Sequence, residues 1–177
     1  LLELQAGLYG VQEKDRIIKP CMTVVDLGAA PGSWSQVVQS VIGSKGKIFA
    51  LDILPMDPIN DVSIITGDFT DEAVLKQLED ELGGEKVDLV LSDIAPNKSG
   101  HKSVDQPKSI YLNELALDFA INHLKPGGDF LCKVFQGVGS QEFHQSLRDS
   151  FSKVITRKPK ASRDSSTEIY LLGKTLK

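Results

Sequence analysis

Short apolar runs rich in β-branched residues alternate along the chain with segments whose apolar positions lie three and four apart. The runs predict strands over 22–28, 46–53, 62–68, 86–93, 129–137, 154–159 and 167–174. The helical spacing predicts helices over 33–43, 71–84, 108–128 and 140–151. Strands that alternate with helices are typical of an α/β fold with a mostly parallel, doubly wound, Rossmann-like sheet. The last two strands are joined by a loop alone, so we expect an antiparallel C-terminal hairpin at one edge.

Length and composition predict one globular domain spanning 1–177. The chain has 177 residues, of which 41% are hydrophobic and 25% charged, which is enough to bury a single core. No apolar run is long enough to cross a bilayer, so we expect no membrane association. Cys21 and Cys132 have neither metal-ligand nor disulfide-framework spacing, which favours a metal-free protein of the reducing cytoplasm. The chain starts at Leu1 instead of methionine, so we expect residues 1–20 to be an N-terminal segment whose beginning is missing.

The loop after the first predicted strand, in "VVDLGAAPGSW" (24–34), points to a nucleoside-like ligand. Gly28 permits a sharp exit from the strand, and Gly32 would let a ligand approach the backbone closely. The spacing is not the dinucleotide fingerprint, and Pro31 stiffens the loop. Asp26 brings negative charge to a place where a pyrophosphate would be repelled. We therefore expect an acidic mouth suited to a cationic ligand, and a nicotinamide dehydrogenase is disfavoured.

Carboxylates stand at the ends of the following strands, at Asp52, Asp68 and Asp93. In a parallel sheet these ends share one rim, where ligands bind at the reversal of strand order. Asp52 is placed to accept both hydroxyls of a ribose, and Asp68 to accept an adenine amino group while Phe69 packs on the ring. Asp68 and Asp93 could each be a turn or cap residue instead. Together the acids indicate an adenosine-containing cationic cofactor, S-adenosylmethionine.

One lysine stands inside an apolar strand, at Lys133 in "DFLCKVFQG" (129–137). A buried ammonium must find a partner or reach water along its own stem. The simpler interpretation is that Lys133 lies on a solvent-facing side of the strand.

Several stretches resemble, in order and spacing, the FtsJ/RrmJ family of ribosomal RNA 2′-O-methyltransferases. They are "VVDLGAAPGSWSQ", "DILPMDP", "SDIAPNKSG", "KVFQG" and "ASRDSSTEIY", and the similarity runs from about Glu13 to the end. The resemblance implies a Rossmann-like methyltransferase sheet and S-adenosylmethionine-dependent methylation of a ribose 2′-hydroxyl. It implies as substrate a uridine of ribosomal RNA within the large ribosomal subunit. Carried over by motif, the residues that would contact the cofactor are Gly32, Trp34, Asp52, Asp68 and Asp93.

The family's catalytic set is Lys-Asp-Lys-Glu, of which three members have counterparts here. Asp93 matches the aspartate, Lys133 the second lysine and Glu168 the glutamate. The first lysine has no counterpart: an ungapped alignment puts Gly7 there, and a gapped one puts the lysine before Leu1. We expect Lys133 to orient the 2′-hydroxyl and stabilise its developing negative charge, with Asp93 and Glu168 holding the lysine in place.

Charge distribution bears on the partner. The net charge is −4, with acids crowded into 52–93 and a basic stretch at 153–163. For contact with RNA phosphates we expect four cations near the crevice: Lys98, Lys102, Lys158 and Arg163. Two alternatives stay open, namely transfer RNA or an mRNA cap as substrate, and a paralogue that binds the cofactor or RNA without catalysis. We expect a monomer.

Overall fold

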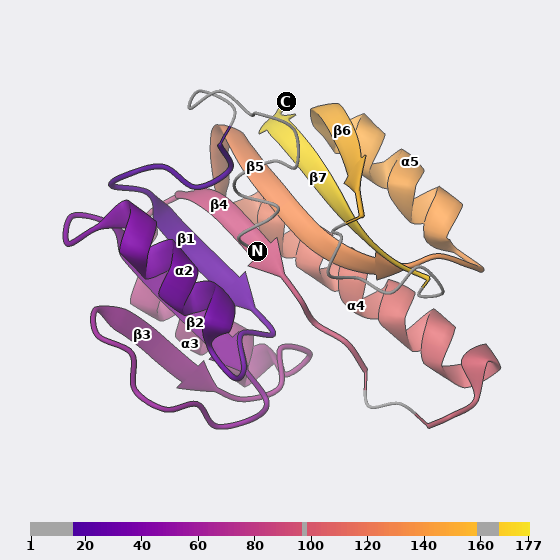
Figure 1. The fold of residues 1–177 in the computed structure, drawn as a ribbon, viewed down its shortest axis with the longest axis horizontal. Helices are drawn as coiled ribbons and strands as arrows, with labels where there is room; N and C mark the ends of the chain where they lie inside the picture. Colours follow the sequence, from indigo (N-terminus) through magenta and orange to yellow (C-terminus); the bar gives the residue numbers. More distant parts are fainter. Residues whose placement is uncertain (1–15, 97–98, 159–166) are drawn as a thin grey trace.

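The computed structural model describes residues 16–96, 99–158 and 167–177, and its strands form one seven-stranded sheet in the order β3-β2-β1-β4-β5-β7-β6 (Figure 1). The strands are β1 (Thr23–Leu27), β2 (Lys47–Asp52), β3 (Val62–Thr66), β4 (Val87–Ser92), β5 (Leu124–Phe135), β6 (Phe151–Arg157) and β7 (Glu168–Leu176). The helices are α2 (Ser33–Ile42), α3 (Glu72–Leu82), α4 (Lys102–His123) and α5 (Ser140–Ser150). The predicted α/β alternation is confirmed.

Strand pairing places the carboxyl ends of the parallel strands at one rim of the sheet. The pairs among β1 to β5 are parallel, and the chain order reverses between β1 and β4, which lie side by side. The carboxyl ends of these two strands therefore flank the switch point at which such sheets bind ligands. The predicted antiparallel hairpin of β6 and β7 is confirmed. β7 also pairs with β5 and so lies between β5 and β6, which leaves β6 at the edge.

Apolar side chains cover both faces of the sheet. On one face α3, α4 and α5 pack through residues such as Leu78, Phe119 and Phe143, and Figure 1 shows these helices behind the sheet. On the other face α2 packs Val38 and Ile42 over the first strands. Burying each such side chain contributes about 1.5–3 kcal/mol. No helix in the described ranges has the length and apolarity needed to cross a membrane.

The long helix begins earlier than the sequence predicts. The sequence predicts a start at 108, after Pro107, but α4 starts at Lys102 and carries Pro107 inside it. The Asp105 carboxylate accepts hydrogen bonds from the backbone N–H groups of Ser99 (2.8 Å) and Gly100 (3.2 Å). These bonds fasten the preceding loop to the first helical turn, so the helix tolerates a proline that removes one internal hydrogen bond.

The same helix also ends earlier, because "LKPGG" (124–128) belongs to β5. Leu124 pairs with Val87 of β4, and the register then shifts between Val87 and Leu89. Such a shift accommodates extra residues in one strand of a pair, here the stretch that contains the proline and two glycines. The Pro-Gly-Gly sequence is therefore an irregularity within β5, and the prediction of a helix to 128 is wrong.

Candidate active site

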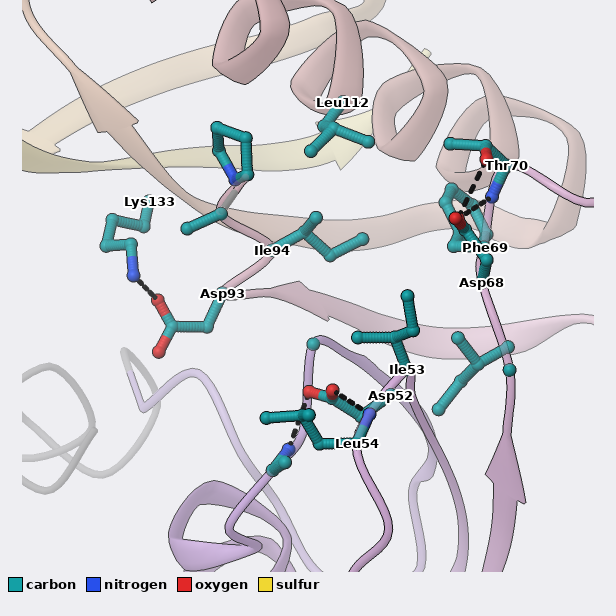
Figure 2. Close-up of a pocket in the computed structure, with 16 residues that line it drawn as sticks. Asp52, Ile53, Leu54, Asp68, Phe69, Thr70, Asp93, Ile94, Leu112 and Lys133 are labelled. Atoms are coloured by element: carbon teal, nitrogen blue, oxygen red, sulfur yellow. Dashed lines mark hydrogen bonds and ion pairs between the residues drawn. The ribbon is translucent and has the colours of Figure 1, made fainter. Parts of the chain in front are cut away.

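A pocket of about 400 Å³ opens beyond the carboxyl ends of the parallel strands (Figure 2). This volume lies within the range of small-ligand sites. Six of the residues that the sequence singled out line it: Gly28, Asp52, Asp68, Phe69, Asp93 and Lys133. Figure 2 shows Asp93 and Lys133 at one end and Asp68 with Phe69 at the other, with Ile94 and Asp52 between them. The pocket is therefore elongated, with an ion pair at one end and an aromatic ring at the other.

Asp52 organises the loops that form the floor of the pocket. Its carboxylate accepts hydrogen bonds from the backbone N–H of Ala30 (2.9 Å), after β1, and of Leu54 (2.8 Å), after β2. A carboxylate offers about four acceptor sites, so two remain to accept the hydroxyls of a ligand. Asp52, which the sequence predicts to bind a ribose, thus also has a structural role.

Asp68 also has both a structural and a ligand-facing side. Its Oδ1 atom accepts hydrogen bonds from the backbone N–H (2.9 Å) and hydroxyl (2.8 Å) of Thr70, as a turn residue does. Both bonds fall on one oxygen, so Oδ2 stays available at the pocket. Phe69 next to it is buried and meets Phe119 edge to face at 5.9 Å, which fixes its ring as a wall.

Lys133 and Asp93 form an ion pair at the opposite end. The Lys133 Nζ atom lies 2.5 Å from Asp93 Oδ1, and the two side chains are 13% and 29% exposed (Figure 2). The ammonium also lies 5.7 Å from the centre of the Phe135 ring. Burial raises the pKa of Asp93, an effect that Lys133 opposes and the negative charge of Glu168 reinforces. Lys133 thus faces the crevice and not open solvent.

Glu168 and Tyr170 approach the same end from β7. The β5–β7 register places Tyr170 opposite Lys133 and Glu168 opposite Phe135. The Tyr170 hydroxyl donates to Glu168 Oε1 at 3.3 Å. Burial raises the pKa of the Tyr170 phenol, and the charges of Asp93 and Glu168 raise it further. These interactions bring the side chains of four residues together beside the pocket.

Tyr170 belongs to this cluster of side chains, although the sequence did not single it out. Its ring packs on Trp34 of α2, with centroids 5.8 Å apart. The sequence carried a usable signal, because residues two apart in a strand share a face and Tyr170 is two residues after Glu168. The contact places Trp34 beside Tyr170, which pairs with Lys133 across the sheet.

Asp26 is buried, so the expectation that it makes the pocket mouth acidic is wrong. Its side chain is fully enclosed, and its Oδ2 atom accepts a 2.6 Å hydrogen bond from the Ser35 hydroxyl of α2. Burial raises the pKa of Asp26 to about 7; the hydrogen bond from Ser35 opposes the shift, and the charges of Asp93 and Asp52 add to it. Strand alternation directs Asp26 toward α2 and away from solvent.

The two glycines of the first loop are needed for internal contacts. Gly28 has φ +74°, and a Cβ atom there would lie 2.7 Å from the Ile94 backbone nitrogen. Gly32 has φ +109°, and its Cβ would lie 2.8 Å from the Ile59 side chain. Gly28 lines the pocket, whereas Gly32, Pro31 and Trp34 are not among the residues that line it.

The predicted RNA-contacting cations are only partly described. Lys98 and Arg163 lie outside the described residues, as does Gly7, the position aligned with the first catalytic lysine. Lys102 is the first residue of α4, and Lys158 is exposed just after β6.

Comparisons with known proteins identify the family of the chain. The profile of the FtsJ-like methyltransferase family matches residues 6–176. The Ribosomal RNA large subunit methyltransferase E of Azoarcus sp. is 59% identical over 170 residues, covering 96% of this chain and 83% of the relative. The protein of the same name from Pseudomonas aeruginosa is 56% identical over 167 residues, covering 94% of this chain and 81% of its own length.

Solved structures support the same fold. A candidate ribosomal RNA methyltransferase from Plasmodium falciparum superposes with a TM-score of 0.75 at 30% identity, covering 89% of this chain and 88% of that one. Fibrillarin from Aeropyrum pernix, solved with natively bound S-adenosyl-L-methionine, shares the fold with a TM-score of 0.61 at 14% identity, covering 94% and 70%. With the family profile spanning nearly the whole chain, this chain belongs to the FtsJ-like methyltransferase family.

Proposed function

We propose that this chain is an enzyme that transfers a methyl group from S-adenosylmethionine to the 2′-hydroxyl of a ribose, at a uridine of large-subunit ribosomal RNA. The observation that carries the proposal is the Lys133–Asp93 ion pair at one end of the pocket, joined by Glu168 and Tyr170. The names of the relatives support the RNA class, and the family supports the methyl transfer.

The residues around the pocket fit the cofactor. Spare acceptor sites on the Asp52 carboxylate suit a ribose diol, and the free oxygen of Asp68 beside the Phe69 ring suits an adenine. Asp93 supplies negative charge where a cationic group would lie. When bound there, S-adenosylmethionine supplies an electrophilic methyl group on a sulfonium. We assign cofactor contact to the pocket residues Gly28, Asp52, Asp68, Phe69 and Asp93. For Pro31, Gly32 and Trp34, which do not line the pocket, the assignment rests on the resemblance of their loop to the family alone.

Lys133 is placed to act on the substrate hydroxyl. Its ammonium lies at the pocket wall and has a buried stem, so it is a positive charge in a partly dry site. Such a charge would stabilise the negative charge that develops on the ribose oxygen as the hydroxyl gives up its proton, before that oxygen takes the methyl group from sulfur. The hydroxyl proton passes to solvent or to a neighbouring carboxylate. Alignment of the reacting atoms lowers a large part of the barrier.

Asp93 and Glu168 position the lysine. Asp93 binds the ammonium directly, and Glu168, hydrogen-bonded by Tyr170, adds a second negative charge nearby. Because Asp93 and Glu168 hold the long Lys133 side chain in one rotamer, its charge stays beside the position that the ribose hydroxyl must occupy. Tyr170 acts through Glu168 and is therefore a positioning residue.

The test is the replacement of Lys133. Lys133→Ala should lower methyl transfer to large subunits isolated from cells lacking the modification by more than about 100-fold. Lys133→Arg should fail as well, because a planar guanidinium cannot place its charge at the same point. Cofactor affinity, measured by calorimetry, should stay within about twofold. Lys125→Ala, on the same strand and paired with Asp88, is the matched control and should retain activity.

Two results would reject the assignment. If cofactor binding falls in parallel with transfer, Lys133 is structural. If the wild-type protein binds S-adenosylmethionine and methylates no RNA under conditions that suffice for a relative, the chain is a binding protein without catalysis.

A further inference from the structure

A second hollow, of about 430 Å³, opens between α3 and α4 next to the candidate active site. The two cavities share Phe69 and Thr70. The floor of the second one is apolar and includes Leu75 from α3 and Leu115 from α4. Tyr111, on the wall, is 55% exposed although it is a large aromatic residue. We call this hollow the α3–α4 groove.

The rim of the α3–α4 groove is acidic. Asp71, Glu72 and Glu79 contribute carboxylates from α3 and its cap, and Asp118 contributes one from α4; all four residues are exposed. Among the described residues that line the groove there is neither lysine nor arginine. The one imidazole, of His123, lies 3.1 Å from Glu79 and stacks on Phe119. The acids that crowd into 52–93 in the sequence thus gather partly at this groove.

The charge of the rim selects the class of partner. A phosphate backbone would be repelled by four carboxylates, so RNA does not fit this groove. Lysine and arginine side chains fit both parts of it: their aliphatic stems cover apolar surface such as Leu75 and Leu115, and their charged heads reach the acids. An arginine head also stacks favourably on an exposed tyrosine such as Tyr111.

We propose that the α3–α4 groove binds a lysine- and arginine-rich polypeptide segment of a protein that accompanies the RNA substrate. The proposal rests on the proposed function, because proteins bound to ribosomal RNA carry basic segments that neutralise phosphates. Such a contact anchors the enzyme to a ribonucleoprotein surface while the separate crevice beside Lys133 engages the ribose. The shared Phe69 and Thr70 place the partner directly against the cofactor pocket.

A pair of isosteric double variants tests the groove. Glu72→Gln with Asp118→Asn removes two charges from the rim. Glu81→Gln with Glu114→Gln removes two charges from exposed positions on the same helices but outside the groove, and is the matched control. Urea denaturation of both proteins checks that each is folded.

The first measurement is fluorescence anisotropy with a labelled nine-residue peptide of alternating lysine and leucine, and with its glutamate counterpart. The groove variant should bind the lysine peptide about tenfold more weakly than wild type, and the control variant should match wild type. The glutamate peptide should not bind. Equal affinity of both double variants for the lysine peptide, or no binding by wild type, would overturn the proposal.

Further measurements test whether something else occupies the α3–α4 groove. If the groove variant alters the affinity for a labelled polyuridine oligonucleotide more than the control variant does, the groove contacts RNA and the proposal is wrong. If it alters the sedimentation mass, the groove holds a second copy of the chain and the proposal is equally wrong. With undermethylated large subunits as substrate, the groove variant should raise KM about tenfold and leave kcat unchanged. If the wild-type protein transfers no methyl group to these subunits, the proposed function is rejected. The peptide measurement would still decide the role of the groove.

Discussion

Replacing Asp26 with asparagine should remove a pH dependence from the stability of this fold. Asp26 is enclosed between β1 and α2, and burial raises the pKa of its carboxyl from 3.8 to about 7. Asparagine has nearly the same shape and stays neutral. Its side-chain carbonyl can accept the hydrogen bond that the Ser35 hydroxyl now donates to the carboxylate.

The sign of the effect follows from proton binding in the two states. Between pH 4 and pH 7 the native state holds a proton on Asp26 that the unfolded chain has released. The free energy of unfolding therefore falls as pH rises through this window, and it levels off above pH 7, where both states are ionised. From pH 5 to pH 8 the loss amounts to about 3 kcal/mol, because each unit below pH 7 contributes about 1.4 kcal/mol. The Asp26→Asn variant should not show this fall in the free energy of unfolding.

Urea unfolding, monitored by the fluorescence of Trp34, the single tryptophan, gives the free energy of unfolding at each pH. The difference between variant and wild type isolates Asp26, because other acids with raised pKa values, such as Asp93 and Asp129, titrate in both proteins. The variant should gain about 3 kcal/mol on wild type between pH 5 and pH 8. Ser35→Ala should extend the loss of stability to higher pH, since it removes the hydrogen bond that holds the pKa of Asp26 down. Parallel curves for Asp26→Asn and wild type would refute the reasoning.

Three further predictions concern the pocket and the core. Gly28→Ala should lower the free energy of unfolding by about 2 kcal/mol or more, because φ is +74° and the new methyl group would strike the chain after β4; an unchanged urea midpoint would contradict this. Asp52→Ala should weaken cofactor binding at least about tenfold in calorimetry, because two backbone N–H groups lose their acceptor and the loops around them loosen. Cys132 is buried, and burial raises the pKa of its thiol, so a thiol reagent should modify Cys21 alone in the native protein and both cysteines in urea; modification of Cys132 without unfolding would contradict the buried position.

The strands could be predicted from sequence because their signal is local. Runs such as "VVDLG" and "DLVLSD" combine β-branched residues with abrupt ends, and the observed strands begin and end within three residues of the prediction for all but β5. The errors lie where proline and glycine residues suggested the end of an element and contacts with other parts of the chain prevailed. Pro107 stays inside α4 because Asp105 secures the turn before it, and the Pro-Gly-Gly stretch joins β5 because Leu124 finds a partner on β4.

The site was predictable to the extent that topology alone brings residues together. Asp52 ends β2, and Asp68 and Asp93 come just after β3 and β4, so strand order alone implies a common rim, and all three line the pocket. Strand alternation puts Tyr170 on the same face as Glu168, but its place opposite Lys133 depends on the antiparallel register between β5 and β7, which no local pattern specifies. The burial of Asp26 depends on which face α2 covers, and strand alternation gives a face without saying what lies over it.

The position of β7 has a consequence for how the protein is made. β7 follows the other six described strands in the chain, yet it must enter between β5 and β6, which are already synthesised. Until it does, both neighbours present unpaired backbone edges, which are templates for aggregation. A nascent chain that stops short of Glu168 would hold the Asp52 and Asp68 rim and the Lys133–Asp93 pair, but not the glutamate or tyrosine that complete that end. Translation therefore delivers the strands that carry the Asp52 and Asp68 rim first, and the strand that carries Glu168 and Tyr170 last.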